Sequence, residues 1–334
     1  MLASADHRLS LCKRWAEAQL GGELAWADVS VDASTRRYFR TWRADDAARR
    51  WIVVDAPPDS QDSQAFVDIA ALFQAAGLHV PRVRAADIER GLLLLSDLGD
   101  IRYIDRLHPD NADALFSVAI DALVDWQAAS RPGVLPAYDR ATLWREIRLF
   151  DQWYLPHVLG ETPDADQIQA LTRAYTFIID RMSAQAPVFV HRDYMPRNLM
   201  VCEPLPGILD FQDARYGPAS YDVASLFMDA FISWPAERVA GWQHDYWQAA
   251  HARGIPVAAD WPTFQTDVAL SGAQRHLKIM GLFVRLAYQQ GKHAYAADLG
   301  RFAGYLAPVV NAHAALAPLR APIAAALAHH ETRP

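Results

Sequence analysis

The sequence predicts an α+β chain with a small β-rich part over residues 1–98 and a large helical part over residues 99–334. Before Leu98, short apolar runs bounded by turn residues follow one helical segment and surround another, as expected for a small sheet with helices beside it. After Leu98, apolar residues recur at helical spacing through long segments. Strands and helices that are segregated along the chain in this way are typical of the α+β class.

Two helices and four strands are expected in the N-terminal part. The helices are predicted at residues 9–20, before Gly21-Gly22, and at 62–76, with Asp62 as N-cap and Gly77 as its end. The strands are predicted at residues 38–42, 51–55, 80–83 and 91–95. The last strand is continuously apolar, so we expect it to be buried.

The C-terminal part is expected to be a set of helices with one interruption. Helices are predicted at residues 111–129, 140–155, 164–185, 222–232, 236–253, 262–290 and 292–306, and the alanine-rich end is expected to form another. The interruption, residues 188–221, contains only short apolar runs. The polar residues that are capable of chemistry gather in it.

Composition limits the kinds of function that fit. With 52% hydrophobic and 21% charged residues the chain is expected to be globular, and its net charge of −7 argues against nucleic-acid binding. No apolar run approaches the length of about 18 residues that would span a membrane. The N-terminus shows no secretory pattern, and Cys12 and Cys202 are too few for a disulfide framework. We therefore expect a cytoplasmic protein.

A constellation in the interruption points to phosphoryl transfer. Asp193 and Asn198 are separated by four residues, and Asp210 follows Asn198 by 12 positions. Phosphoryl transfer requires a carboxylate that accepts the proton of the acceptor hydroxyl, together with oxygen ligands for Mg²⁺. The three residues, each beside an apolar segment, meet these requirements. The alternative is a loop in which they cap helices or form turns.

This pattern resembles the aminoglycoside-phosphotransferase/kinase-like superfamily, relatives of the protein kinases. The similarity lies in three motifs: His191-x-Asp193-x4-Asn198, Asp210-Phe-Gln and Tyr221-Asp222-Val-Ala-Ser-Leu226. The resemblance implies a bilobal protein-kinase-like fold that uses ATP and Mg²⁺. It implies that Asp193 is the catalytic base and that Asn198 and Asp210 bind Mg²⁺. His191 and Asp222 would then brace the loop.

The spacing after the metal-binding motif favours a small-molecule acceptor. Protein kinases place a long activation loop and an Ala-Pro-Glu segment there. In this chain Asp213 and Asp222 are nine positions apart, and no Ala-Pro-Glu follows. We therefore expect no docking platform for a protein substrate and no obligatory protein partner.

The nucleotide-binding part is expected to depart from the kinase pattern. Kinases place a lysine on the third strand, but residues 51–55 contain none. Period-2 alternation puts Arg36, Tyr38 and Arg40 on one face of the preceding strand, so one of the two arginines could replace the lysine. The alternative is that they are surface arginines on an exposed hairpin.

Two further segments are expected to contact the nucleotide. The turn that contains Ser34 stands where kinases have a glycine-rich loop. Ser96, Asp97 and Leu98 are expected to form the hinge whose backbone recognises adenine. Residues 1–98 are accordingly expected to bind the nucleotide, and residues 99–334 to carry the catalytic and substrate-binding groups.

The chain looks closest to one branch of this superfamily, the bacterial N-acetylmuramate/N-acetylglucosamine 1-kinases. The resemblance rests on Asp32–Arg40, Asp55–Pro58, Ala76–Pro81, Leu95–Gly99, His191–Tyr194, Leu209–Asp213 and Gln274–Lys278. It implies an amino-sugar substrate that is phosphorylated on its anomeric hydroxyl during peptidoglycan recycling.

Residues that could bind such a sugar lie in the helical part. The ring of Trp153 could stack on a pyranose, and Arg275, His276 or Lys278 could meet the lactyl carboxylate of N-acetylmuramate. Packing in the core is the other interpretation. Two other functions remain open: a kinase of another small alcohol such as an aminoglycoside, which the basic cluster at 275–278 argues against, and a catalytically silent pseudokinase.

Overall fold

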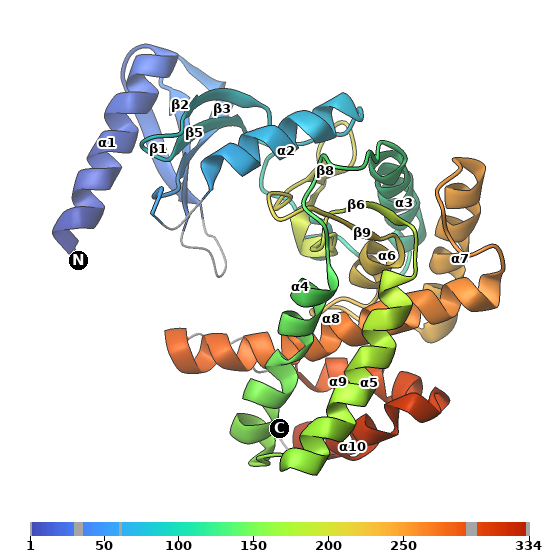
Figure 1. Cartoon of the computed structure of the whole chain (residues 1–334). Helices are drawn as coiled ribbons and strands as arrows, with labels where there is room; N and C mark the ends of the chain where they lie inside the picture. Colours follow the sequence, from blue (N-terminus) through green and yellow to red (C-terminus); the bar gives the residue numbers. More distant parts are fainter. Residues whose placement is uncertain (1, 30–35, 60–61, 292–298, 332–334) are drawn as a thin grey trace. The chain divides into compact units, whose positions relative to one another are not determined.

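A computed structural model describes residues 2–29, 36–59, 62–291 and 299–331 (Figure 1). The chain forms two compact units. Unit 1 consists of Met1–Arg106 with Arg197–Gln212, and unit 2 consists of Leu107–Pro196 with Asp213–Pro334. The boundary was expected at residue 98, so unit 1 is larger than predicted.

Backbone hydrogen bonds explain why Arg197–Gln212 joins unit 1. The segment contains a two-stranded sheet, β7 (Leu199–Met200) with β8 (Gly207–Ile208). The amide of Ile208 donates to His79 at 2.8 Å, and the amide of Val201 donates to Ile101 at 2.7 Å. These pairs join segments about 100 residues or more apart in the chain, which local sequence patterns do not reveal.

The main sheet of unit 1 has five antiparallel strands in the order β1-β2-β3-β5-β4. They are β1 (Leu24–Val29), β2 (Arg37–Arg43), β3 (Asp46–Asp55), β4 (Val83–Asp87) and β5 (Leu92–Ser96). Strand β1 was not predicted. The strand expected at residues 80–83 was misplaced, because His79 forms a bridge with Gly207 instead and the strand begins only at Val83.

Two helices cover this sheet, and both predictions of them are confirmed. Figure 1 shows helix α1 (Leu2–Leu20) beside the strands of this sheet. The helix contributes Cys12 and Ala16 to a core shared with Phe39, Val53 and Leu94. Helix α2 (Ser63–Ala75) begins at the predicted cap, since the amide of Ala65 donates to Asp62 at 2.9 Å.

Unit 2 is mostly helical, which confirms the predicted α+β class. Its α-helices are α3 (Ala112–Ala128), α4 (Arg140–Ile147), α5 (Ala165–Ser183), α6 (Ser220–Phe227), α7 (Ala236–Ala252), α8 (Trp261–Gln290), α9 (Leu299–Ala312) and α10 (Ala317–Glu331). A two-stranded sheet, β6 (Pro187–Val190) with β9 (Arg215–Pro218), precedes α6. No helix in the described ranges is long and apolar enough to cross a lipid bilayer.

The predicted helix at 140–155 is divided. Helix α4 ends at Ile147, and a π-helix follows over Phe150–Leu159. It contains Pro156, which cannot donate a backbone hydrogen bond, and it ends at the left-handed Gly160. The π-helix packs on α8, where a Cβ added to Gly281 would lie 2.0 Å from the carbonyl oxygen of Leu149.

Candidate active site

The loop that carries Asp193 begins where the buried strand β6 ends. Its residue Arg192 has φ +77°, a left-handed conformation that is uncommon outside glycine. The carboxylate of Asp222 accepts from the amides of His191 and Arg192, at 2.6 and 2.8 Å. Asp222 lies in the first turn of α6 and is fully buried. It therefore fixes the backbone at the unusual residue directly before Asp193.

Burial has a cost for Asp222 itself. Removal from water raises the pKa of this carboxyl to about 7, although the two amide hydrogen bonds act in the opposite direction. His191 is also fully buried, and its Nδ1 accepts from the amide of Asp193 at 3.3 Å. Both residues expected to brace the loop thus contact its backbone.

Asp193 is held from the side of α8. Arg275, only 2% exposed, donates from Nη1 to Asp193 Oδ1 and to the carbonyl oxygen of Arg192, both at 3.1 Å. Burial alone would raise the pKa of Asp193, but the charges of Arg275, Lys278 and Arg192 outweigh it and hold that pKa well below its usual range. The Asp193 side chain remains 34% exposed. It is therefore an ionised carboxylate that is accessible to a ligand.

A largely buried carboxylate, that of Glu146 on α4, balances the remaining cations. It pairs with Arg192 at 2.5 Å and with Lys278 at 3.5 Å, and it accepts a hydrogen bond from Tyr138 at 2.5 Å. Burial would raise the pKa of Glu146, but Lys278 and Arg192 lower it overall. Neither Glu146 nor Tyr138 was predicted from the sequence, where a single glutamate in a helical segment carries no distinguishing signal.

In unit 1, the short sheet β7–β8 brings Asn198 and Asp210 together. Asn198 directly precedes β7, and the amide of Leu209 donates to its carbonyl oxygen at 2.9 Å. The side-chain amide of Asn198 lies 3.4 Å from Asp210 Oδ2, and Gln212 donates to Asp210 Oδ1 at 2.8 Å. Asp210 has φ +60°. Phe211 packs on Phe66 of α2, which anchors this segment.

The donors in this cluster fit Mg²⁺ better than a metal that needs a full set of protein ligands. Asp210 and Asn198 offer carboxylate and amide oxygens, the hard ligands that Mg²⁺ prefers. Within the described part of the chain, no group of three or more His, Cys, Asp and Glu side chains could hold a metal ion. Mg²⁺ tolerates this because it is usually bound through one or two carboxylates, with waters and substrate phosphates completing its shell.

The arginines expected near the nucleotide have different surroundings. Arg36 directly precedes β2 and is 9% exposed. Burial raises the pKa of the nearby Tyr38 most; the charge and hydrogen bond of Arg36 lower it, and the charge of Asp210 raises it. Arg36 and Asp210 therefore both lie close to Tyr38.

Arg40 and Arg37 have carboxylate partners within unit 1. Arg40 pairs with Asp97 at 2.5 Å and also with Asp100. Arg37 pairs with the buried Asp55. Arg36 thus differs from Arg40 in its neighbour: Arg36 hydrogen-bonds Tyr38, whose pKa the charge of Asp210 also raises, whereas Arg40 pairs with Asp97 and Asp100.

The expected hinge begins at Ser96, the last residue of β5, and its side chains are engaged within unit 1. Ser96 Oγ accepts from the amide of Arg82 at 2.8 Å, Asp97 pairs with Arg40, and Leu98 is buried. The amide of Ser96 also donates to the carbonyl oxygen of Arg82, at 2.9 Å. Ser34 lies outside the described residues.

The side chains expected to bind a sugar do not lie in one place. Trp153 stacks on His157 at 5.2 Å, and His157 contacts Tyr288 at 4.5 Å. Tyr288 lies 13 residues beyond Arg275 on α8, which corresponds to about 20 Å along the helix. Trp153 is therefore grouped with the far end of α8 and not with the Asp193 loop, and its surroundings give a sugar contact there no support.

His276 is directed into the core. It is 1% exposed, donates to the carbonyl oxygen of Met228 at 3.2 Å and stacks on Tyr305 at 5.1 Å. Burial lowers the pKa of His276 to about 3. A neutral, buried imidazole of this kind has no accessible charge for a carboxylate.

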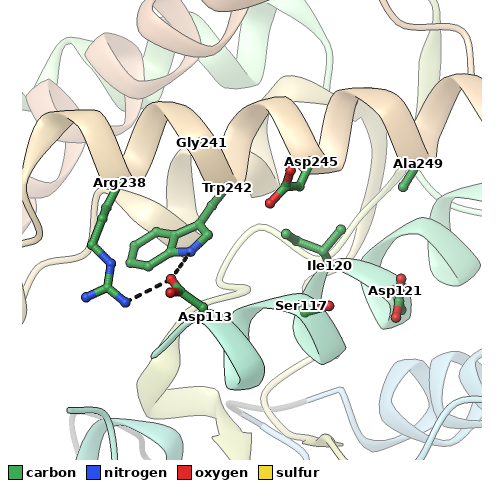
Figure 2. A pocket seen from close by; sticks show the side chains of 9 residues that line it. All are labelled: Asp113, Ser117, Ile120, Asp121, Arg238, Gly241, Trp242, Asp245 and Ala249. Atoms are coloured by element: carbon green, nitrogen blue, oxygen red, sulfur yellow. Dashed lines mark hydrogen bonds and ion pairs between the residues drawn. The ribbon is translucent and has the colours of Figure 1, made fainter. Parts of the chain in front are cut away.

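Unit 2 also has a cavity of about 370 Å³ between α3 and α7 (Figure 2). Figure 2 shows Asp113 accepting hydrogen bonds from Arg238 and Trp242, while Asp121 and Asp245 line the same space. None of the residues predicted to act in catalysis lines this cavity.

Comparison with known proteins gives consistent results. Residues 26–263 match the family described as "Phosphotransferase enzyme family". A Pseudomonas putida protein named N-acetylmuramate/N-acetylglucosamine kinase is 46% identical over 94% of this chain and 95% of its own length. A Pseudomonas aeruginosa protein of the same name is 48% identical over 89% of this chain and 88% of its own length.

Solved structures share the fold at low sequence identity. The choline kinase LicA from Streptococcus pneumoniae has a TM-score of 0.63 at 12% identity and covers 91% of this chain and 99% of its own. The ADP-bound aminoglycoside phosphotransferase APH(2'')-Ib has a TM-score of 0.56 at 11% identity and covers 87% of this chain and 95% of its own.

Proposed function

Because this chain belongs to the phosphotransferase enzyme family, we propose that it is an ATP- and Mg²⁺-dependent kinase of N-acetylmuramate and N-acetylglucosamine. The proposed acceptor is the anomeric C1 hydroxyl, as expected in peptidoglycan recycling. The names of the two Pseudomonas relatives support the choice of substrate. For the chemistry, the proposal rests on one observation, the ionised and accessible Asp193 on a loop that Asp222 holds in place.

In the proposed reaction, the oxygen of the sugar hydroxyl forms a bond to the γ-phosphorus of ATP, and the bond from that phosphorus to ADP breaks. Asp193 accepts the proton that the hydroxyl loses. The low pKa of Asp193 makes it a weak base, which suits a loose transition state in which the proton leaves late. Its main task is then to direct the hydroxyl oxygen toward phosphorus.

Asn198 and Asp210 would hold Mg²⁺, which offsets phosphate charge when Mg²⁺-ATP is bound. Arg36 is the arginine that we propose for the function of the absent strand lysine, since it hydrogen-bonds Tyr38, a residue that the charge of Asp210 also affects. Arg40, with its two carboxylate partners, is the weaker candidate. Ser34 and the hinge Ser96–Leu98 remain proposed nucleotide contacts.

The cations expected to meet the lactyl carboxylate have acidic partners of their own. Arg275 pairs with Asp193, and Lys278 pairs with Glu146. We therefore assign neither to the substrate. The proposed setting is the cytoplasm, where ATP is available and the thiols of Cys12 and Cys202 stay reduced.

ATP consumption by the purified protein tests the proposal. The acceptors are N-acetylmuramate and N-acetylglucosamine, with choline and an aminoglycoside as comparisons because proteins acting on these compounds share the fold. Turnover with either amino sugar and none with the other compounds is the expected result. Turnover with choline or the aminoglycoside alone would contradict the proposed substrate. The absence of turnover with every acceptor would favour a silent pseudokinase.

A further inference from the structure

Five charged side chains form a connected group beneath the Asp193 loop, all within unit 2. Arg275 and Lys278 come from α8, Glu146 from α4, and Arg192 and Asp193 from the loop itself. Arg275 pairs with Asp193, while Glu146 pairs with both Arg192 and Lys278. The hydrogen bond from Arg275 to the carbonyl oxygen of Arg192 connects the two sets. Apart from Asp193, whose side chain is accessible, these side chains are largely buried, and such charges are costly unless paired, so their geometry is expected to be specific.

Arg275 contacts two consecutive residues of the loop. Its Nη1 donates to the side chain of Asp193 and to the main chain of Arg192, while Nη2 lies 3.6 Å from the sulfur of Met195. A planar guanidinium that bonds a side chain and the preceding carbonyl at once restricts the rotation of that side chain. Arg275 itself cannot turn away freely, because it lies in the middle of a 30-residue helix and is almost fully buried.

Lys278 and Glu146 act on the loop at a different point. Glu146 pairs with Arg192 rather than with Asp193, and Lys278 pairs with Glu146. The ring of Tyr138 lies against the Arg192 guanidinium, 5.0 Å from its centre. The Arg192 side chain is thus fixed toward α4, while Arg275 holds the carbonyl of the same residue and the carboxylate of the next.

We propose that Arg275 is a positioning residue that sets the direction of the Asp193 carboxylate, with Glu146 and Lys278 supporting it through Arg192. The inference rests on the proposed function of Asp193 and deepens it. It assigns Arg275 to the catalytic base and not to the carboxylate of the sugar. Loss of Arg275 is therefore expected to reduce turnover more than substrate binding.

The charge of Arg275 also affects the ionisation of Asp193. The charged and titratable groups that face Asp193 are Arg275 and Lys278 from α8, Arg192 and His191 from the loop, and Asp222 from α6. Removal of one of the cations raises the pKa of the carboxyl. The acidic limb of the kcat profile is then expected to move to higher pH.

Kinetics of Arg275→Met and Arg275→Lys test the proposal. For Arg275→Met we expect kcat to fall by at least about tenfold, with both KM values within about threefold of wild type. Arg275→Lys keeps the positive charge but cannot bond both the Asp193 carboxylate and the carbonyl oxygen of Arg192 in the same way. The acidic limb of its pH profile should therefore lie where it does in wild type, while its kcat should lie between those of Arg275→Met and wild type. An unchanged kcat, or a rise in the sugar KM alone, would overturn the proposal.

Arg181→Met is the matched control. Arg181 reaches α8 from α5 and pairs with the largely buried Asp267 at 2.6 Å, so its loss also breaks an ion pair on α8 without touching the loop. It should leave kcat close to that of wild type. A similar fall of kcat in both variants would assign the effect to general loss of stability and contradict the positioning role.

Hydrogen exchange gives a readout that is independent of turnover. Amides of the segment 190–196 should exchange faster in Arg275→Met than in wild type, and should be unchanged in Arg181→Met. Equal protection of this segment in all three proteins would overturn the inference, whatever the kinetic constants of the variants. A wild-type protein that phosphorylates no amino sugar would refute the proposed function, and the exchange data would still decide whether Arg275 holds the loop.

Discussion

At the scale of single residues, neighbours in the sequence can have unrelated partners. Arg36 hydrogen-bonds Tyr38, Arg37 pairs with Asp55, and Arg40 pairs with Asp97. Strand alternation placed Arg36 and Arg40 on one face, but it could not reveal that Arg40 meets two carboxylates from a segment about 60 residues away. The same limit applies to Glu146, since only the packing of α4 on α8 identifies it.

Arg36→Ala should impair nucleotide use more than Arg40→Ala. Arg36 is the proposed replacement for the strand lysine, so its loss is expected to raise the KM for ATP or lower kcat by at least about tenfold, roughly 1.4 kcal/mol. Arg43→Ala, which removes an exposed pair with Asp45, serves as the control. Steady-state kinetics decide the point. Equal and negligible effects of Arg36→Ala and Arg40→Ala would place the compensating charge elsewhere.

His276 should make stability dependent on pH. Its pKa in the folded protein is about 3, far below the value of about 6.5 in an unfolded chain. As pH falls below about 6.5, the unfolded state takes up the proton first, so the free energy of unfolding decreases by about 1.4 kcal/mol per pH unit from this group.

His276→Gln removes that titration while keeping a donor for Met228. Denaturant unfolding at about pH 7.5 and about pH 5 should show a smaller loss of stability in the variant than in wild type, by roughly 2 kcal/mol. An identical pH dependence in the two proteins would mean that His276 binds a proton as readily in the folded protein as in the unfolded chain.

At the scale of elements, periodicity predicted most helices well but failed where packing changes the backbone. The π-helix Phe150–Leu159 follows α4 in place of a continuous helix, and it lies against α8. Pro156 was a visible signal of disruption; the close approach of Leu149 to Gly281 was not. Strand β1 was missed because its six residues do not alternate between buried and exposed positions, as a strand with one buried face would. The N-cap of α2 could be predicted, because Asp62 accepts its hydrogen bond from an amide only three residues later in the sequence.

Gly281→Ala should destabilise unit 2. An added Cβ would meet the carbonyl carbon and oxygen of Leu149 at 2.1 and 2.0 Å, so α8 and the π-helix must move apart, at a cost of about 1–3 kcal/mol. Gly241→Ala is the control, since a Cβ there meets nothing within 4 Å in the interior of α7. Alanine should stabilise that helix by about 0.5–1 kcal/mol. Thermal unfolding that moves in the same direction in both variants would contradict this packing.

At the scale of the whole molecule, the residues proposed for catalysis belong to both units. Asp193 lies in unit 2, whereas Asn198 and Asp210 lie in unit 1. The motif spacing in the sequence predicted this set of residues. It could not predict that the chain leaves unit 2 at Arg197 and returns at Asp213, because that exchange depends on pairing of β8 with the distant His79.

Asp210→Ala should change the dependence of turnover on Mg²⁺ more than the binding of the sugar. Its carboxylate belongs to the proposed metal site, so a higher Mg²⁺ concentration should be needed for half-maximal rate. Titration of the rate with Mg²⁺ at saturating sugar measures this. An unchanged Mg²⁺ dependence would remove Asp210 from the metal site.

The central claim is that this chain transfers phosphate from ATP to the C1 hydroxyl of an amino sugar, with Asp193 as base. ³¹P–¹H NMR of the product tests it most directly, using N-acetylmuramate and N-acetylglucosamine with the wild-type protein and with Asp193→Asn. We expect coupling of the new phosphorus to the anomeric proton, and a rate about 10²–10⁴-fold lower in the variant. Phosphate on another carbon, or equal rates in the two proteins, would contradict the claim.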